Sequence, residues 1–132
     1  MNALTSKHRL IKAYTLDFGY IEIYPNFAIG SMNDGIDLTL ENISSLASLA
    51  EIHYRNKNFG YISLRKNSYA IDPALYAYIK EVENLKAVAI VSTKEIFKHN
   101  YKIEKYFYGK EMKLFRNIEN AIQWVHANCN DQ

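Results

Sequence analysis

Asp72 is the acidic residue best placed to do chemistry in this sequence, because tyrosines gather around it. Tyr69, Tyr76 and Tyr78 all lie within six positions of it. A carboxylate beside phenol hydroxyls could bind a ligand or a partner, so we name Tyr69, Asp72 and Tyr76 as candidate binding residues. A structural alternative stays open. Asp72 precedes Pro73, the order expected of a helix N-cap with proline in the first turn, and the tyrosines could be core or rim aromatics.

The basic segment 94–116 is a second candidate, since aromatic residues are interleaved with its lysines. Such a mixture could bind single-stranded nucleic acid or an anionic membrane surface. An amphipathic surface helix with a solvated lysine face and a buried aromatic face gives the same pattern. No known RNA-binding motif is present, so we expect no nucleic-acid partner. The basic residues are Lys94, Lys98, Lys102, Lys105, Lys110, Lys113 and Arg116, against Glu95, Glu104 and Glu111.

Catalytic and metal-binding motifs are missing from the sequence. Its four histidines are widely separated and have no metal-ligand spacing. There is no glycine-rich phosphate loop and no GxSxG elbow, and the single cysteine, Cys129, lies in a polar tail. We therefore expect a protein that is not an enzyme and that uses no metal and no cofactor. An enzyme built on residues outside these motifs stays an alternative.

Length and composition indicate one ordinary globular domain. The chain has 132 residues, is 48% hydrophobic and 23% charged, and has a formal net charge of +2. No window approaches the apolar length of a membrane span, and the N-terminus lacks the apolar core of a secretory signal. One cysteine cannot form an internal disulfide, so a cytoplasmic location is expected. Residues 1–7 are expected to be flexible, and 128–132 to form a polar tail.

Three strands are expected at the front of the chain. Apolar and polar residues alternate over 8–24, and the turn signal at 17–20 predicts a hairpin. Pro25 breaks the second strand because it has no amide hydrogen to donate. Residues 27–32 resume as a third strand. The turn sequence at 33–35 then ends this part of the chain.

Two helices and a strand are expected in the middle of the chain. Thr39 can cap the first helix. Residues 59–64 follow as a strand, which we expect to be central in the sheet. Asp72 and Pro73 then start a second helix, expected to run to about Val82. The apolar stripe of the first helix consists of Ile43, Leu46, Ala47, Ala50 and Tyr54.

The last third of the chain predicts strand, helix, strand and helix. The continuous apolar run 87–91 is typical of a strand buried on both faces, and 112–115 is a short second strand. This alternation predicts parallel strands joined by right-handed crossovers. With the front strands, it gives a single α/β domain over residues 1–132. We expect a mixed sheet of five or six strands packed with about four helices.

Capping residues bound the last two predicted helices. Ser92 and Glu95 have the spacing of a capping box, which predicts a helix from 93 to about 108. Gly109 suits a left-handed C-cap. Asn117 can cap the final helix. The apolar face of that helix consists of Ile118, Ala121, Ile122 and Val125.

Two stretches resemble the SpoIIAA-like family of small STAS-type domains, which are related in fold to the CRAL-TRIO lipid carriers. Residues 113–125 resemble the C-terminal strand and capped helix of that family, including the pattern Glu-x-Ala-x-x-Trp. Residues 61–64 and 69–75 resemble the STAS strand, loop and helix start. The resemblance covers roughly 59–126 and implies a STAS-like mixed sheet.

One departure from the family concerns its phosphorylated serine. STAS antagonists of anti-sigma factors carry an Asp-Ser pair at the start of the helix, where this chain has Asp72 and Pro73. Proline has no hydroxyl, so a phosphorylation switch at this position is chemically impossible. Ser68, four residues before Asp72, is a poor substitute.

These observations favour a non-catalytic cytoplasmic module that regulates or binds another protein. The alternative, implied by the relation to CRAL-TRIO domains, is a carrier of a small hydrophobic ligand or lipid. The aromatic-rich segments 69–78 and 97–108 support that alternative. The front strands could also leave an exposed edge that pairs two copies in a homodimer. The sequence identifies neither the biological process nor the partner or ligand.

Overall fold

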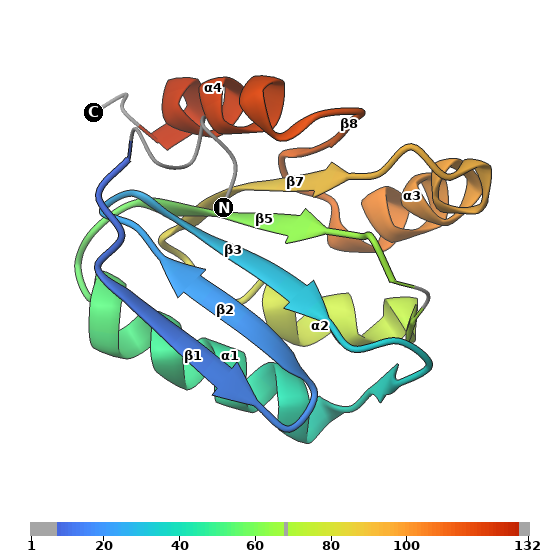
Figure 1. Ribbon diagram of the computed structural model, residues 1–132, viewed down its shortest axis with the longest axis horizontal. Helices are drawn as coiled ribbons and strands as arrows, with labels where there is room; N and C mark the ends of the chain where they lie inside the picture. The colour runs from blue at the N-terminus through green and yellow to red at the C-terminus, as the bar shows by residue number, and fades with distance from the viewer. Residues whose placement is uncertain (1–7, 68, 130–132) are drawn as a thin grey trace.

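A six-stranded mixed sheet forms the centre of the fold (Figure 1). The computed structural model describes residues 8–67 and 69–129. The predicted flexible terminus at 1–7, Ser68 and the last three residues of the predicted tail lie outside the described residues. In spatial order the strands are β1 (Lys12–Leu16), β2 (Gly19–Ile23), β3 (Phe27–Met32), β5 (Phe59–Leu64), β7 (Leu85–Val91) and β8 (Met112–Phe115).

The pairing of the strands confirms the predicted mixed sheet. β1, β2 and β3 form an antiparallel meander, and β3, β5, β7 and β8 run parallel. β7 lies between β5 and β8, and each residue of its segment 87–91 is at most 5% exposed. The prediction that this apolar run is an interior strand is therefore confirmed.

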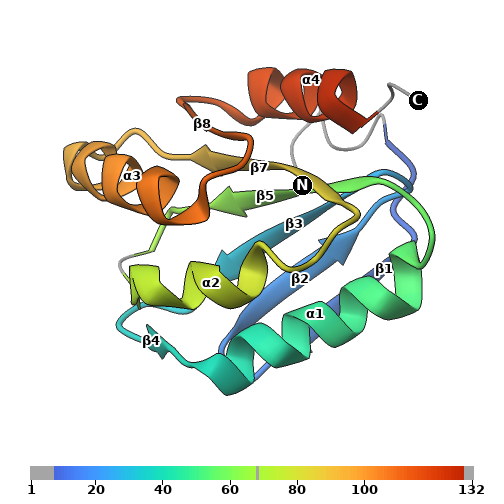
Figure 2. The same cartoon turned by 180° about the vertical axis from the view of Figure 1, so that it is seen from behind.

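Helices cover both faces of the sheet (Figures 1 and 2). α1 (Leu40–Tyr54), α2 (Tyr76–Ile79) and α3 (Glu95–Tyr108) lie on one face, and α4 (Ile118–Cys129) lies on the other. The crossovers through α1, α2 and α3 each advance one strand toward β8 on the same face, so all three have the same hand. A short parallel ladder joins β4 (Asp37–Leu38) to β6 (Ala70–Ile71), which the sequence patterns did not predict.

The core under α4 is closely packed. Ala87, Ala89 and Ala121 have no exposed surface, and α4 lies directly on β5 and β7. A Cβ atom at Gly60 would overlap Cγ1 of Val125, so the glycine allows α4 to approach β5 this closely. On the other face, the described residues of α1 come less close to the strands than α4 does.

Most of the predicted caps are present. The Thr39 side chain accepts a hydrogen bond from the Asn42 amide, and the Asn42 side-chain oxygen accepts one from the Thr39 amide, which completes a capping box. Gly109 ends α3 in the left-handed region with φ 70°. Asn117 accepts from the Asn120 amide at the start of α4. These local signals fixed the helix ends because each satisfies an otherwise unpaired backbone group.

Three predictions about helix ends are wrong. Ser92 does not cap α3: its hydroxyl accepts from the Lys94 amide in a turn before the helix, which begins at Glu95 without a side-chain cap. The helix expected after Asp72 is only a 3₁₀ turn, Pro73–Leu75, followed by the four residues of α2. Cys129 is not in a polar tail but is the buried last residue of α4.

Tyr54 anchors the C-terminal end of α1 to the sheet. Its hydroxyl bonds to the carbonyl oxygens of Tyr24 and Phe27, each at 2.7 Å, and its ring stacks on Phe59 at 4.5 Å between centroids. Few other α1 side chains are buried, so this contact holds much of the helix in place.

Replacing Tyr54 with phenylalanine should lower the free energy of unfolding by about 1–3 kcal/mol. The substitution keeps the stacked ring but removes the hydroxyl that bonds to the Tyr24 carbonyl; the Phe27 carbonyl still accepts from the Tyr24 amide. Urea denaturation measures the change. The same replacement at Tyr106, whose side chain is 82% exposed, is the matched control and should leave stability nearly unchanged.

Candidate functional site

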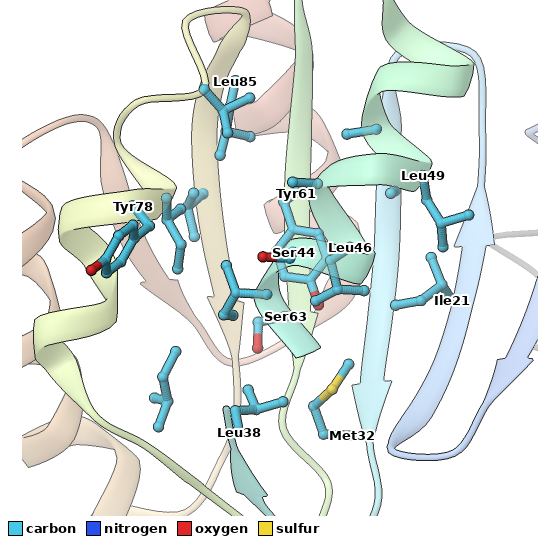
Figure 3. A pocket seen from close by; sticks show the side chains of 18 of the residues that line it. Ile21, Met32, Leu38, Ser44, Leu46, Leu49, Tyr61, Ser63, Tyr78 and Leu85 are labelled. Carbon is cyan, nitrogen blue, oxygen red and sulfur yellow. The ribbon is translucent and has the colours of Figure 1, made fainter. Parts of the chain in front are cut away.

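An apolar cavity of about 210 Å³ lies between the sheet and the helices α1 and α2 (Figure 3). Its floor comes from β2, β3, β5 and β7, and its walls come from the two helices. Side chains that are themselves exposed, Leu40, Ser44 and Ala47 of α1 and Tyr78 of α2, also line it. They mark a mouth between the two helices, open to solvent.

The composition of α1 explains why this space is not filled. Its apolar stripe contains short side chains, Ala47 and Ala50, where a packed helix carries larger ones. Only Ile43 and Tyr54, near its two ends, are buried. Close packing needs side-chain volume from both layers. The side chains in the middle of α1 have little volume, so a hollow remains between this helix and the sheet.

Strand β5 sends alternate side chains into the cavity. Phe59, Tyr61 and Ser63 point toward the helices, because successive strand residues face opposite sides of a sheet. Figure 3 shows Tyr61 and Ser63 inside the cavity, from the same strand. The Tyr61 ring extends over Gly30 of β3, where an added Cβ would overlap its hydroxyl oxygen. Glycine at this position therefore allows the phenol to lie across the floor.

A buried ion pair closes one end of the cavity. The guanidinium of Arg65, just beyond β5, bonds to both carboxylate oxygens of Glu104 on α3, each at 2.8 Å. Both side chains are less than 5% exposed. The guanidinium also contacts the rings of Tyr69 and Phe97, at 5.3 and 5.4 Å from their centroids. The ion pair therefore places one positive and one negative charge in the protein interior, and the two charges cancel.

Hydroxyl groups complete the polar end. Tyr76 donates to Oε1 of Glu104 at 2.6 Å, and Arg65 Nε donates to the Ser63 hydroxyl at 2.9 Å. The hydroxyls of Ser63 and Tyr69 are 3.0 Å apart. Arg65, Ser63, Tyr69 and Tyr76 all line the cavity. We call these four residues and Glu104 the polar cluster.

Two members of the polar cluster, Tyr76 and Arg65, keep their protons around neutral pH. Burial raises the pKa of Tyr76 well above its usual value, and the charge of Glu104 adds to this effect. Burial alone would lower the pKa of Arg65, but the hydrogen bonds to Glu104 and the electrostatic interactions with Tyr69, Glu104 and Tyr76 together raise it. Tyr76 therefore stays protonated and Arg65 stays charged. Neither is poised to exchange a proton near neutral pH.

The structure separates the three candidate residues named from the sequence. Tyr69 and Tyr76 come together in the polar cluster and line the cavity. Asp72 is exposed and caps the 3₁₀ turn, where its carboxylate accepts from the Ala74 amide at 3.0 Å. It is not among the side chains that line the cavity.

The site also contains four residues that the sequence patterns did not predict: Arg65, Glu104, Ser63 and Tyr61. A signal for Glu104 was present, since it falls at helical spacing between Phe97 and Tyr108 on the buried face of α3. A carboxylate on an apolar helix face needs a buried partner. Nothing in the sequence identified Arg65, 39 residues away, as that partner.

The helix in the basic segment 94–116 has one buried face and one exposed face, as an amphipathic surface helix does. Phe97 and Tyr108 are buried in the core, whereas Lys94, Lys98 and Lys102 are exposed. Phe97 and Tyr108 therefore pack inward, whereas Tyr106 and Phe107 at the end of α3 are exposed, as the lysines are.

No protein-family model, curated protein or solved structure matches this chain. In the part of the chain that the structure describes, no three His, Cys, Asp or Glu side chains form a group that could hold a metal ion. Within residues 8–67 and 69–129, no helix has the length and apolar character of a membrane span. The cavity and its polar cluster are therefore the features from which a function can be argued.

Proposed function

We propose that this protein is a non-catalytic binding protein for a small hydrophobic ligand, which it holds in the cavity between α1, α2 and the sheet. The observation that carries the proposal is the cavity itself: about 210 Å³ of space, lined mainly by aliphatic and aromatic side chains, with a mouth between two helices. Ligand sites of soluble proteins have this character, apolar walls with a few placed polar groups.

Two further points support ligand binding over catalysis. The charged groups at the cavity are paired with each other, so none is left to act as a free acid, base or nucleophile there. The resemblance to SpoIIAA-like domains, related to the CRAL-TRIO carriers, also favours a bound hydrophobic ligand. We propose the cytoplasm as its location, because the single cysteine cannot form an internal disulfide.

Binding of ethylbenzene tests this proposal, because that probe is apolar and small. Isothermal titration calorimetry should show one molecule bound per chain with a negative heat-capacity change, the signature of apolar burial. Native mass spectrometry of protein purified under mild conditions should also show a carried ligand above the mass of the chain. No ethylbenzene binding, together with the bare chain mass in every preparation, would contradict the proposal.

A second candidate is the regulatory or protein-interaction module favoured by the sequence. One observation favours it: Ile96, Ile103 and Phe107 lie on a single face of α3 and are 59%, 39% and 44% exposed. An apolar stripe on a surface helix suits a partner with a complementary groove. The edge strand β1 stays a predicted contact for a homodimer.

The α3 stripe can be tested separately from the cavity. A genuine partner should be captured by the wild-type protein and by the exposed control Lys98→Glu, and lost by Ile103→Glu. If no captured protein distinguishes Ile103→Glu from the control, this second function is wrong. The titration with ethylbenzene should be unaffected by either substitution, since neither residue lines the cavity.

A further inference from the structure

The Tyr61 hydroxyl differs from the hydroxyl groups of the other buried and half-buried residues that line the cavity. No hydrogen bond from a described residue reaches it, whereas the hydroxyls of Tyr54, Ser63, Tyr69 and Tyr76 all have protein partners. A hydroxyl that faces an apolar cavity without a protein partner must bond to water or to a bound ligand, because an unmade hydrogen bond is costly. A group on the ligand can supply the partner that the protein does not.

The position of Tyr61 suits it to this role. Its side chain lies on the cavity face of β5, across the glycine at position 30, with apolar side chains such as Met32 and Leu46 around it (Figure 3). Burial also raises the pKa of the Tyr61 phenol, so the group is protonated and can donate as well as accept. Tyr61 thus offers a neutral hydrogen-bonding group inside the cavity, whereas the hydroxyls of Ser44 and Tyr78 line it from exposed positions at its mouth.

The charge of the polar cluster sets a second condition on the ligand. Arg65 and Glu104 neutralise each other, so the cavity has no unpaired charge to offer an ionic headgroup. An ion that left water for this space would lose its hydration and gain no counterion. The cavity therefore disfavours carboxylates and ammonium groups alike.

Cavity volume limits the size of the ligand. An apolar cavity of about 150 Å³ binds benzene, so this larger one has room for roughly eight to ten non-hydrogen atoms. We infer that the cavity takes a neutral molecule of that size with one hydroxyl or carbonyl oxygen, and that the Tyr61 hydroxyl binds this oxygen. The inference rests on the proposed function, since it specifies the ligand of the same cavity.

Titration with three eight-carbon amphiphiles tests the inference. At pH 7.4, 1-octanol should bind at least tenfold more tightly than octanoate or octylammonium, which differ from it mainly in headgroup charge. Octanoate or octylammonium binding as tightly as 1-octanol would overturn the inference. This comparison uses the wild-type protein alone, so it does not depend on how any variant folds.

The substitution Tyr61→Phe then tests whether the Tyr61 hydroxyl binds the oxygen atom of the ligand. It should weaken 1-octanol binding by roughly three- to tenfold, the effect of one lost hydrogen bond. Ethylbenzene binding should change by less than twofold, which also shows that the variant is folded. Equal effects on both probes, or none on 1-octanol, would contradict the role of Tyr61.

Ethylbenzene binding also distinguishes a failure of the proposed function from a failure of the inferred ligand class. If ethylbenzene does not bind the wild-type protein, the proposed function fails and this inference fails with it. If ethylbenzene binds and 1-octanol shows neither selectivity nor dependence on Tyr61, only the inferred ligand class is wrong.

Discussion

Replacing Glu104 with glutamine should lower the free energy of unfolding by about 3–5 kcal/mol. Glutamine keeps the shape of the side chain but removes its charge, so the Arg65 guanidinium stays buried without a counterion. Glu104 also accepts from Tyr76, and the substitution weakens that charge-assisted hydrogen bond. Because the ion pair joins the end of β5 to α3, the loss affects the whole domain.

Urea denaturation measures this loss, and a second glutamate supplies the matched control. Glu51 pairs with Arg55 at the same distance, 2.8 Å, but its side chain is 62% exposed. Glu51→Gln should therefore cost roughly 0.5 kcal/mol or less. Equal effects of the two substitutions would show that the pair between Arg65 and Glu104 is not a buried ion pair. Replacing both Arg65 and Glu104 with methionine should recover much of the stability lost by Glu104→Gln.

Replacing Ala50 with phenylalanine should abolish ligand binding, with at least a tenfold loss of ethylbenzene affinity. Ala50 lies on the face of α1 that lines the cavity, so the added ring would occupy the space in which the ligand binds. Stability should be unchanged or higher, because filling a void gains contacts that the wild-type protein lacks. Ethylbenzene titration and thermal unfolding measure the two effects.

Two variants keep the cavity-filling result interpretable. Ala127→Phe adds the same ring on the exposed side of α4, on the opposite face of the sheet, and should leave ethylbenzene binding intact. Ala47→Phe fills the cavity from the neighbouring turn of α1, and should block binding if Ala50→Phe does not fold. Full binding in a folded Ala50→Phe variant would mean that ethylbenzene binds elsewhere.

The architecture could be predicted from the sequence because its signals are local. The apolar run at 87–91 indicates burial on both faces, and Thr39, Gly109 and Asn117 satisfy backbone groups within a few residues. The capping box at Ser92 failed since the spacing of two residue types does not fix their backbone conformation. Local pattern therefore gave the order of the elements more reliably than their ends.

The cavity could not be predicted in the same way. The stripe on α1 that includes Ala47 and Ala50 is typical of a helix packed on a core, and only the distance from α1 to the sheet shows that it borders a hollow. The pair between Arg65 and Glu104 depends on two elements that are joined through a crossover. Tyr69 and Tyr76 were named for their nearness to Asp72 along the chain, and that nearness did not indicate the contacts they make.

The methyl signals of two methionines test most directly whether the cavity binds a hydrophobic ligand. Met32 lines the cavity, whereas Met112 is equally buried on β8 and does not line it. In protein labelled with ¹³C at the methionine methyl groups, and assigned through Met32→Leu and Met112→Leu, saturating ethylbenzene should shift the Met32 signal and leave Met112 nearly unchanged. A Met32 signal that stays in place at saturation, or equal shifts at both positions, would contradict a ligand in this cavity.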